Sequence, residues 1–293
     1  MTTSRPAFIA FALFLAGCAT STPDSSVEAR VGQGDTEITE APPIRAETPI
    51  PDESLLPLLQ AEFALRQRDF DQGLALLAQQ AALLEDPALA RRALRLAEFV
   101  NDTDQAAMMA VRLVELDPDD GAAAAAASGW LSRAGRPVDA VYYAMLAFEH
   151  GHPVNVATNL GTYDTLDEVS QEAIAEAIRA IAAQWPEDDQ AAIAASLLAR
   201  LEGKFKRAET LILPVLERAP QDIRAVMLWT QLMLDQGVDD PFDLLATTVS
   251  RYPDTQELRL QYARLLGSEG NYLGARAQFV LLLERDPKNA ELL

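Results

Sequence analysis

The side chains that could do chemistry are few in this sequence. Cys18 is the only cysteine among 293 residues, and His150 and His152, in the stretch EHGHP, are the only histidines. A metal site built on the two imidazoles needs at least one further ligand, such as Glu149, and the spacing does not demand one. A polar helix end explains the histidines better. We find no Ser/His/Asp set, phosphate loop or metal-ligand motif, so the sequence predicts no enzymatic activity and no cofactor or metal.

Cys18 stands at the end of a short apolar run, residues 6–16, that follows Arg5. The run is too short to span a membrane, which takes ~20 apolar residues. The stretch LAGC at residues 15–18 resembles the lipobox of bacterial lipoprotein signals; the alternative is a buried cysteine in an ordinary secretory signal. The resemblance implies cleavage before Cys18, lipidation of its sulfur and amine, and stable anchoring by more than one acyl chain. With Ala19 and Thr20 next, it implies the periplasmic face of the outer membrane.

Three segments follow from the change in composition along the chain. Residues 1–17 form the predicted signal peptide, and residues 18–54 carry the lipidated Cys18 and a stretch rich in Pro, Ser, Thr and acidic residues without an aromatic. Such a stretch cannot bury enough apolar surface to offset its ordering entropy, so we predict a disordered tether with a reach of roughly 35 Å. Residues 55–293 show helical periodicity instead.

Prolines recur through the helical segment at intervals of 31 to 35 residues: Pro87, Pro118, Pro153, Pro186, Pro220, Pro253 and Pro287. A period near 34 is typical of stacked helical hairpins. Two units repeat the same four residues at the same offsets: Gly203, Phe205, Ala208 and Pro220, then Gly270, Tyr272, Ala275 and Pro287. Glycine allows the turn, the aromatic packs back on the first helix, alanine lets the helices approach, and proline ends the unit.

These residues resemble the tetratricopeptide repeat. The resemblance implies an all-α, tetratricopeptide-type α-solenoid superhelix of about seven helical hairpins over residues 55–293, ending within an eighth unit. The pattern is weakest between Pro153 and Pro186, where we predict an irregular hairpin. At the C-terminal end, Phe279, Leu282 and Leu283 are predicted to lack a cover, which favours a partner or self-association there.

In tetratricopeptide arrays the first helix of each pair lines a concave groove, and the resemblance implies that exposed partner-binding positions lie on these helices. They are Arg133, Gln190, Ile193, Leu197, Arg200, Ile223, Val226, Thr230, Met233, Leu260 and Arg264. An equally weighted alternative is that some of them only close the superhelix. Chaperone-binding repeats hold a peptide carboxylate with Lys and Asn at such places, where this chain has Ala, Ile, Val or Leu, so a carboxylate-clamp co-chaperone is disfavoured.

The net charge is −20, from 44 acidic and 24 basic residues, which disfavours binding to nucleic acid and favours solubility or basic partners. The resemblance implies a non-catalytic, periplasm-facing scaffold lipoprotein that binds envelope proteins. The tether and the repeats starting LLQAEFALRQRDFDQGLALL look most similar to adaptors that deliver substrates, such as peptidoglycan hydrolases, to a carboxyl-terminal processing protease. Alternatives are an assembly factor for an envelope secretin or polysaccharide exporter, and the helical part of a cell-wall lytic enzyme.

Overall fold

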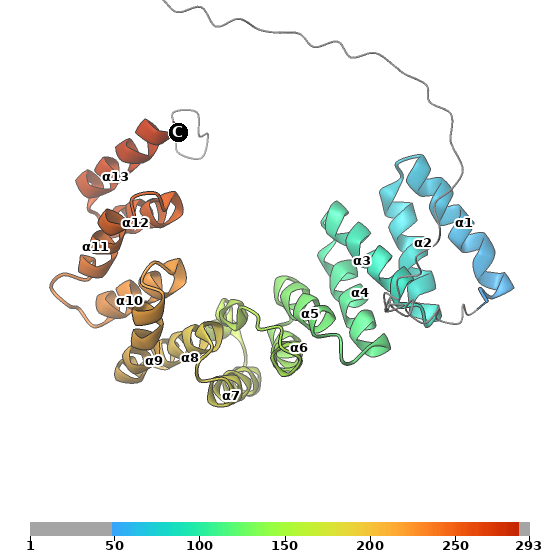
Figure 1. Ribbon diagram of the computed structural model, residues 1–293, viewed down its shortest axis with the longest axis horizontal. Coiled ribbons are helices and arrows are strands. Elements are labelled where there is room, and N and C mark those ends of the chain that lie inside the picture. Colours follow the sequence, from blue (N-terminus) through green and yellow to red (C-terminus); the bar gives the residue numbers. More distant parts are fainter. Residues whose placement is uncertain (1–48, 287–293) are drawn as a thin grey trace, which may run out of the picture. The chain divides into compact units, whose positions relative to one another are not determined.

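The computed structural model describes residues 49–286, which contain only α-helices and two short 3-10 helices as regular elements (Figure 1). The predicted signal segment, Cys18 and most of the predicted tether lie outside the described residues, as do residues 287–293 of the predicted eighth unit. The helical array begins at Asp52, slightly before the predicted boundary at residue 55. Within the described part, the predicted all-α array of about seven hairpin units is confirmed.

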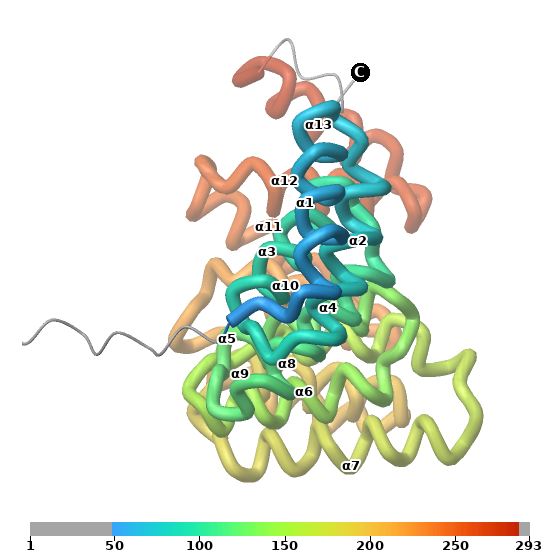
Figure 2. Tube along the Cα trace, turned by 90° about the vertical axis from the view of Figure 1, so that its right-hand side faces the viewer, coloured from blue at the N-terminus to red at the C-terminus, as the bar shows by residue number. Residues whose placement is uncertain are grey.

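The helices form pairs that follow one another along the chain (Figure 2). The first helices of the pairs are α1 (Asp52–Arg66), α3 (Pro87–Val100), α5 (Gly121–Arg133), α8 (Asp189–Leu201), α10 (Ile223–Asp235) and α12 (Gln256–Ser268). The second helices are α2 (Phe70–Leu83), α4 (Thr103–Leu116), α6 (Pro137–Glu149), α7 (Glu168–Gln184), α9 (Phe205–Arg218), α11 (Asp243–Arg251) and α13 (Tyr272–Arg285). Each regular pair packs its two helices together, and most pairs also contact the next pair.

A left-handed residue closes the first helix of every regular hairpin. These residues have φ between +58° and +79° and are Arg68, Asn101, Gly135, Gly203, Gly237 and Gly270. At Gly203 the N–H groups of Gly203 and Lys204 donate to the carbonyls of Arg200 and Ala199, at 2.9 and 2.7 Å. This is the Schellman pattern, which satisfies the last carbonyls of the helix while the chain reverses. The turns therefore fix where each second helix starts.

Two substitutions test the strain at these turns. A Cβ on Gly203 would meet no atom within 4 Å, so Gly203→Ala changes only the backbone preference and should cost about 1 kcal/mol. Arg68 adopts the same conformation with a side chain, so Arg68→Gly should stabilise the chain by about 0.5–1 kcal/mol. Urea unfolding midpoints measure both, and shifts in the same direction would contradict this explanation.

Alanine keeps the two helices of a hairpin close, as predicted. Ala106, Ala140, Ala208 and Ala275 stand five residues after the left-handed turn residue of their units, and all four are buried. In the first unit Gly73 takes this place, because a Cβ there would lie 2.5 Å from Cδ2 of Leu65. The aromatic position is less regular. Phe205 packs against the core as expected, whereas Tyr272 is exposed, so that part of the prediction is wrong.

The fourth unit departs from the pattern, as predicted from its sequence. Two 3-10 helices, η1 (Val156–Leu160) and η2 (Tyr163–Thr165), replace its first helix. The segment η1 packs against α6, α7 and α8, and Val156 and Leu160 join the apolar core of that region. The irregular segment is therefore a packed element that joins the third pair to the fifth unit.

The C-terminal hairpin corrects one expectation. Leu282 of α13 is buried, while Phe279 and Leu283 are half-buried, so the prediction that Leu282 lacks a cover is wrong. The exposed apolar side chains of α13 are instead Tyr272, Leu273, Val280 and Leu281. The α13 helix packs against α12, so Leu282 is covered within this hairpin without a further unit.

Candidate protein-binding surfaces

The predicted groove residues on the first helices are only partly accessible. Arg133 and Arg264 are exposed, and Gln190, Leu197, Arg200, Ile223, Met233 and Leu260 are half-buried. Three others are buried: Ile193 is 3% exposed, and Val226 and Thr230 are 0% exposed. Their assignment as groove contacts is wrong, because their side chains pack into the array.

The error in α10 has a simple geometric cause. Asp222 caps α10 as Asp188 caps α8, each accepting hydrogen bonds from N–H groups of the first turn. Counting from these caps, Arg224 corresponds to Gln190, so the outward positions of α10 are one residue later than predicted. Val226 instead joins a buried cluster with Leu245, Val249 and Leu258.

Ile193 and Thr230 are buried for related reasons. Ile193 belongs to a core cluster that also contains Ile212 of α9 and Leu228 of α10. Thr230 lies on the inner side of α10, where its hydroxyl donates to the carbonyl of Val226 at 2.9 Å. On α10, the sequence analysis missed Met227 and Gln231, which are both half-buried.

Polar contacts tie successive first helices together. Arg200 of α8 donates through Nε to Oδ2 of Asp235 of α10 at 2.6 Å. Arg224 of α10 donates to Gln190 of α8 and to Asp222 at 2.8 Å. Burial raises the pKa of Asp222, but hydrogen bonds from Arg224 and two backbone N–H groups outweigh it and leave the pKa below its ordinary value. Arg200 is thus occupied within the array.

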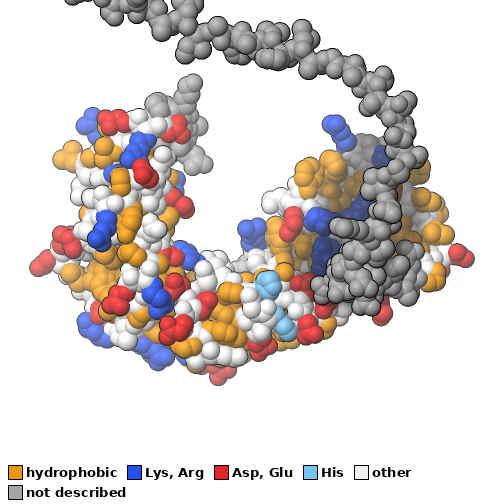
Figure 3. All heavy atoms as spheres, viewed as in Figure 1, with side chains coloured by type: hydrophobic (Ala, Val, Ile, Leu, Met, Phe, Trp, Pro, Cys, Tyr) orange, Lys and Arg blue, Asp and Glu red, His pale blue; other side chains and the backbone are white. Residues whose placement is uncertain are grey.

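Other arginines on the first helices are freer than Arg200 to contact a partner protein. The Arg133 guanidinium lies over the ring of Trp130, 4.7 Å from the ring centre. This cation–π contact leaves the positive charge of Arg133 without a neutralising carboxylate in the described part of the chain. Arg264 is exposed and has no ion pair within residues 49–286. Arg66 and Arg95 likewise lie exposed on α1 and α3, and the predicted groove residues do not include them. Figure 3 shows such charges of both signs among exposed apolar side chains.

We define the first-helix face by the accessible side chains on α8, α10 and α12. It consists of Gln190, Leu197, Met227, Gln231, Leu260 and Arg264. The face combines half-buried apolar groups with polar ones, and the contacts from Arg200 and Arg224 hold two of its helices in register. It can bind an extended or helical segment of a protein through apolar contact and hydrogen bonds.

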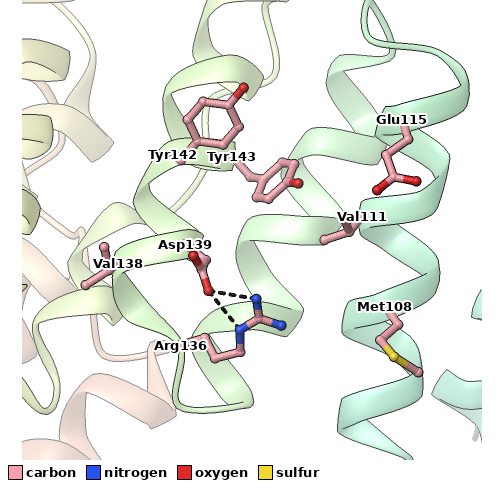
Figure 4. A pocket seen from close by; sticks show the side chains of 8 residues that line it. All are labelled: Met108, Val111, Glu115, Arg136, Val138, Asp139, Tyr142 and Tyr143. Carbon is pink, nitrogen blue, oxygen red and sulfur yellow. Dashed lines mark hydrogen bonds and ion pairs between the residues drawn. The ribbon is translucent and has the colours of Figure 1, made fainter.

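A second accessible surface lies between the second helices α4 and α6. The α4/α6 groove has a volume of about 510 Å³ and is lined by Met108, Val111, Glu115, Arg136, Val138, Asp139, Tyr142 and Tyr143. Figure 4 shows Tyr143 pointing from α6 towards Val111 and Glu115 of α4. Nε and Nη2 of Arg136 both lie 2.8 Å from Oδ2 of Asp139. Sequence reasoning did not find this groove.

A neighbouring groove of about 480 Å³ lies between α2 and α4 and shares Met108 and Glu115 with the first. Arg112 in its wall donates to the carbonyls of Ala81 and Leu84 at 3.1 and 3.3 Å, and to Glu115 at 3.0 Å. Glu115 is therefore held in place on the ridge between the two grooves.

The two histidines lie at the end of the third hairpin. His150 is half-buried and His152 is exposed. A Cβ on Gly121 at the start of α5 would lie 2.5 Å from Cδ2 of His152 and 2.7 Å from Cβ of His150. The histidines thus pack against the start of α5. Within residues 49–286, no three His, Cys, Asp or Glu side chains are grouped as a metal site.

Two glutamates that bridge neighbouring hairpins have lowered pKa values. A hydrogen bond from Arg92 of α3 lowers the pKa of Glu62 of α1 below its ordinary value of 4.5. A hydrogen bond of 2.8 Å from Gln236, after α10, and a second from Lys206 lower the pKa of Glu209 of α9. Protonating either carboxyl weakens a contact between hairpins.

Stability should therefore fall in acid. A carboxyl whose native pKa is lowered stabilises the fold fully above its ordinary pKa, and this contribution is lost as the pH falls through the native value. The urea midpoint should drop between about pH 5 and about pH 3. A Glu62→Gln/Glu209→Gln variant should show a shallower drop, and equal slopes for parent and variant would contradict the assignment.

Comparison with known proteins shows which proteins have a similar repeat sequence. No family model matches the chain. The chain is 27% identical over 214 residues to the TPR repeat-containing protein PA4667 of Pseudomonas aeruginosa, over 72% of this chain and 36% of the relative. The chain is similar to tetratricopeptide-repeat proteins. It spans about a third of that relative's length, and the predicted tetratricopeptide-type α-solenoid fold is confirmed.

Solved structures that are similar to this chain include two at low sequence identity. The type IV pilus biogenesis factor PilW is 15% identical, with a TM-score of 0.43 over 83% of this chain and 98% of that chain. YrrB, a TPR protein with an unusual peptide-binding site, is 12% identical, with a TM-score of 0.34 over 71% of this chain and 90% of that chain.

Within the described part of the tetratricopeptide-type array, no helix has the length and apolarity needed to cross a membrane.

Proposed function

We propose that this chain is a non-catalytic scaffold that binds partner proteins on its first-helix face. The observation that carries the proposal is the coupling of successive first helices through Arg200–Asp235 and Arg224–Gln190, beside the accessible side chains of Leu197 and Met227. A surface whose helices are already fixed relative to one another loses little conformational freedom when a partner binds. The similarity to a tetratricopeptide-repeat protein supports the same role.

We further propose that the scaffold is held at the periplasmic face of the outer membrane by lipid on Cys18, as LAGC and the preceding apolar run indicate. Each buried methylene contributes ~0.8 kcal/mol, so two or more acyl chains anchor the protein stably. Replacement Cys18→Ala should move the protein from the membrane fraction to the soluble fraction of the envelope. An unchanged membrane fraction would show that another element anchors it.

The finer proposal is an adaptor that brings substrates such as peptidoglycan hydrolases to a carboxyl-terminal processing protease. Holding enzyme and substrate on one tethered array raises their effective concentration to the millimolar range. Capture on the whole chain from envelope extracts, with mass spectrometry of the bound proteins, tests this. The adaptor proposal expects a protease and a cell-wall hydrolase to be enriched together. Enrichment of secretin or exporter subunits instead would contradict it and favour an assembly role.

A further inference from the structure

The outer side of α1, the first helix of the described array, carries a row of large apolar side chains. It lies opposite the side that packs on the array, where Ala61 and Ala64 are buried. Each side chain of the row is between 44% and 63% exposed. The row follows one face of the helix, with successive members one turn apart. We call it the α1 stripe, which consists of Leu55, Leu56, Leu59 and Phe63.

In the next hairpin, the corresponding side of the first helix is packed inside the array. Leu56 and Phe63 stand twelve and five residues before the left-handed turn residue of their unit. The same two places in α3 hold Leu89, which is buried, and Leu96, which packs against the core cluster. End repeats of a solenoid usually carry polar residues at such places, because apolar ones would stay in water. The α1 stripe is therefore a packing surface that the described chain leaves uncovered.

The sequence before α1 offers little apolar surface to cover the stripe. Residues 19–48 contain neither leucine nor an aromatic residue, and their four large apolar residues are spread among Pro, Gly and acidic residues. This composition is the reason that the segment is predicted to be a tether. We therefore expect the cover to come from a second molecule.

Two charged side chains mark the ends of the stripe. Asp52 stands seven residues before Leu59 and Arg66 seven residues after it, which keeps both on the face of the stripe. Both are exposed, and within residues 49–286 neither forms an ion pair. Glu62 is already bonded to Arg92 of α3, and this bond, with a smaller effect from the charge of Arg66, lowers the pKa of Glu62. The stripe thus has a carboxylate at one end and a guanidinium at the other.

A second copy of α1 in the opposite direction matches this pattern of charges. When two identical helices pack about a two-fold axis at Leu59, each residue faces the one at the same distance beyond Leu59. Leu55 then faces Phe63 of the second copy, and Asp52 faces Arg66 of the second copy at both ends. A parallel pair would instead bring like charges together. The stripe is therefore complementary to itself in the antiparallel direction only.

We propose that the α1 stripe binds the α1 stripe of a second copy of this chain, as an antiparallel helix pair with two-fold symmetry. Apolar contacts hold the centre of the pair, and two Asp52–Arg66 ion pairs between the copies fix its direction. A pair of 15-residue helices is smaller than the ~1,200–2,000 Å² of most stable interfaces, so association is weak, with a Kd of about 10 μM or more. The stripe shares no residue with the first-helix face, so the proposal does not depend on partner binding there.

Two differently tagged versions of the whole chain, produced in the same cells and extracted with detergent, test the pairing. Capture of one version should bring the other with it. Asp52→Arg in both versions, or Arg66→Asp in both, places two like-charge contacts in every dimer and should lower co-capture about tenfold. Asp52→Arg in one version with Arg66→Asp in the other restores opposite charges at both ends. This mixed pair should return to the co-capture of the parent.

Apolar and control variants complete the experiment. Leu59→Ser/Phe63→Ser in both versions should lower co-capture to a similar degree with every charge in place. Arg95→Asp and Asp104→Arg reverse exposed charges on α3 and α4 and should leave co-capture as in the parent. Circular dichroism melting checks that all variants fold. No co-capture of the parent, unchanged co-capture of the Leu59/Phe63 variant, equal loss in the controls, or no recovery in the mixed pair would overturn the proposal.

Discussion

Replacement of Leu131 by alanine should lower the free energy of unfolding by about 2–5 kcal/mol. Leu131 of α5 is 0% exposed and belongs to the core cluster that joins the first three hairpins, together with Leu113 and Ala140. The substitution removes buried apolar surface and leaves a cavity that the close-packed neighbours fill only in part. Because stability in a repeat array depends on each interface with the next unit, the loss should spread to both neighbouring hairpins.

Urea unfolding followed by circular dichroism measures the effect, and hydrogen exchange shows its spread. The control is Leu213→Ala, since Leu213 is an exposed leucine of α9 and its loss should cost less than about 0.5 kcal/mol. Comparable losses for the two variants, or exchange changes confined to the hairpin of α5, would contradict this description of the core.

Removing apolar groups from the first-helix face should have the largest effect on binding. The Leu197→Ser/Leu260→Ser variant should weaken the capture of partner proteins by about 30-fold, because central apolar contacts of an interface contribute about 2 kcal/mol or more. Both side chains are half-buried, so a moderate loss of stability should accompany the change. Quantitative capture from envelope extracts at matched protein concentration measures the effect.

The control for this experiment is Leu213→Ser. Leu213 is exposed on a second helix, so its replacement changes surface apolarity without touching the first-helix face. Melting curves of both variants show that the array is folded at the temperature of capture. If the control loses as much binding as the double variant, the partner binds elsewhere on the array.

The period of the array could be predicted from sequence because local steric demands fix it. A left-handed turn calls for Gly or Asn, as at Gly203 and Asn101, and a close helix pair calls for a small residue such as Ala208. The proline spacing reflects the same boundaries. The irregular fourth unit could also be predicted, because the stretch NLGTYDTLDEV interrupts the helical pattern. Its Gly161 has φ −62° and does not form a left-handed turn.

The accessible face of α10 could not be predicted in the same way. Its sequence IRAVMLWTQLMLD is apolar on several sides, so periodicity alone does not fix which residues face the core. The N-terminal cap at Asp222 decides the register, and its side-chain hydrogen bonds are seen only in the structure. The pairing of Arg200 with Asp235 also joins residues of different hairpins, which a pattern within one unit does not reveal.

The α4/α6 groove was missed because it belongs to no single repeat. Its walls come from residues near 110 and near 140, and its opening depends on how two second helices sit side by side. The adjacent tyrosines Tyr142 and Tyr143 were the signal in the sequence. In the structure their ring centres lie 5.1 Å apart, and Tyr142 is exposed. Helical periodicity predicts that both tyrosines lie in a helix but does not show that they line a groove.

The central claim is that the first-helix face holds partner proteins, and site-specific photocrosslinking tests it most directly. A photoreactive amino acid placed at Met227 of α10 probes that face, and one placed at Thr210 of α9 probes the second-helix side. We expect irradiation of cells to attach a defined envelope protein at position 227 and none of that protein at position 210. Crosslinking of that protein at position 210 but not at 227, or at neither position, would contradict it.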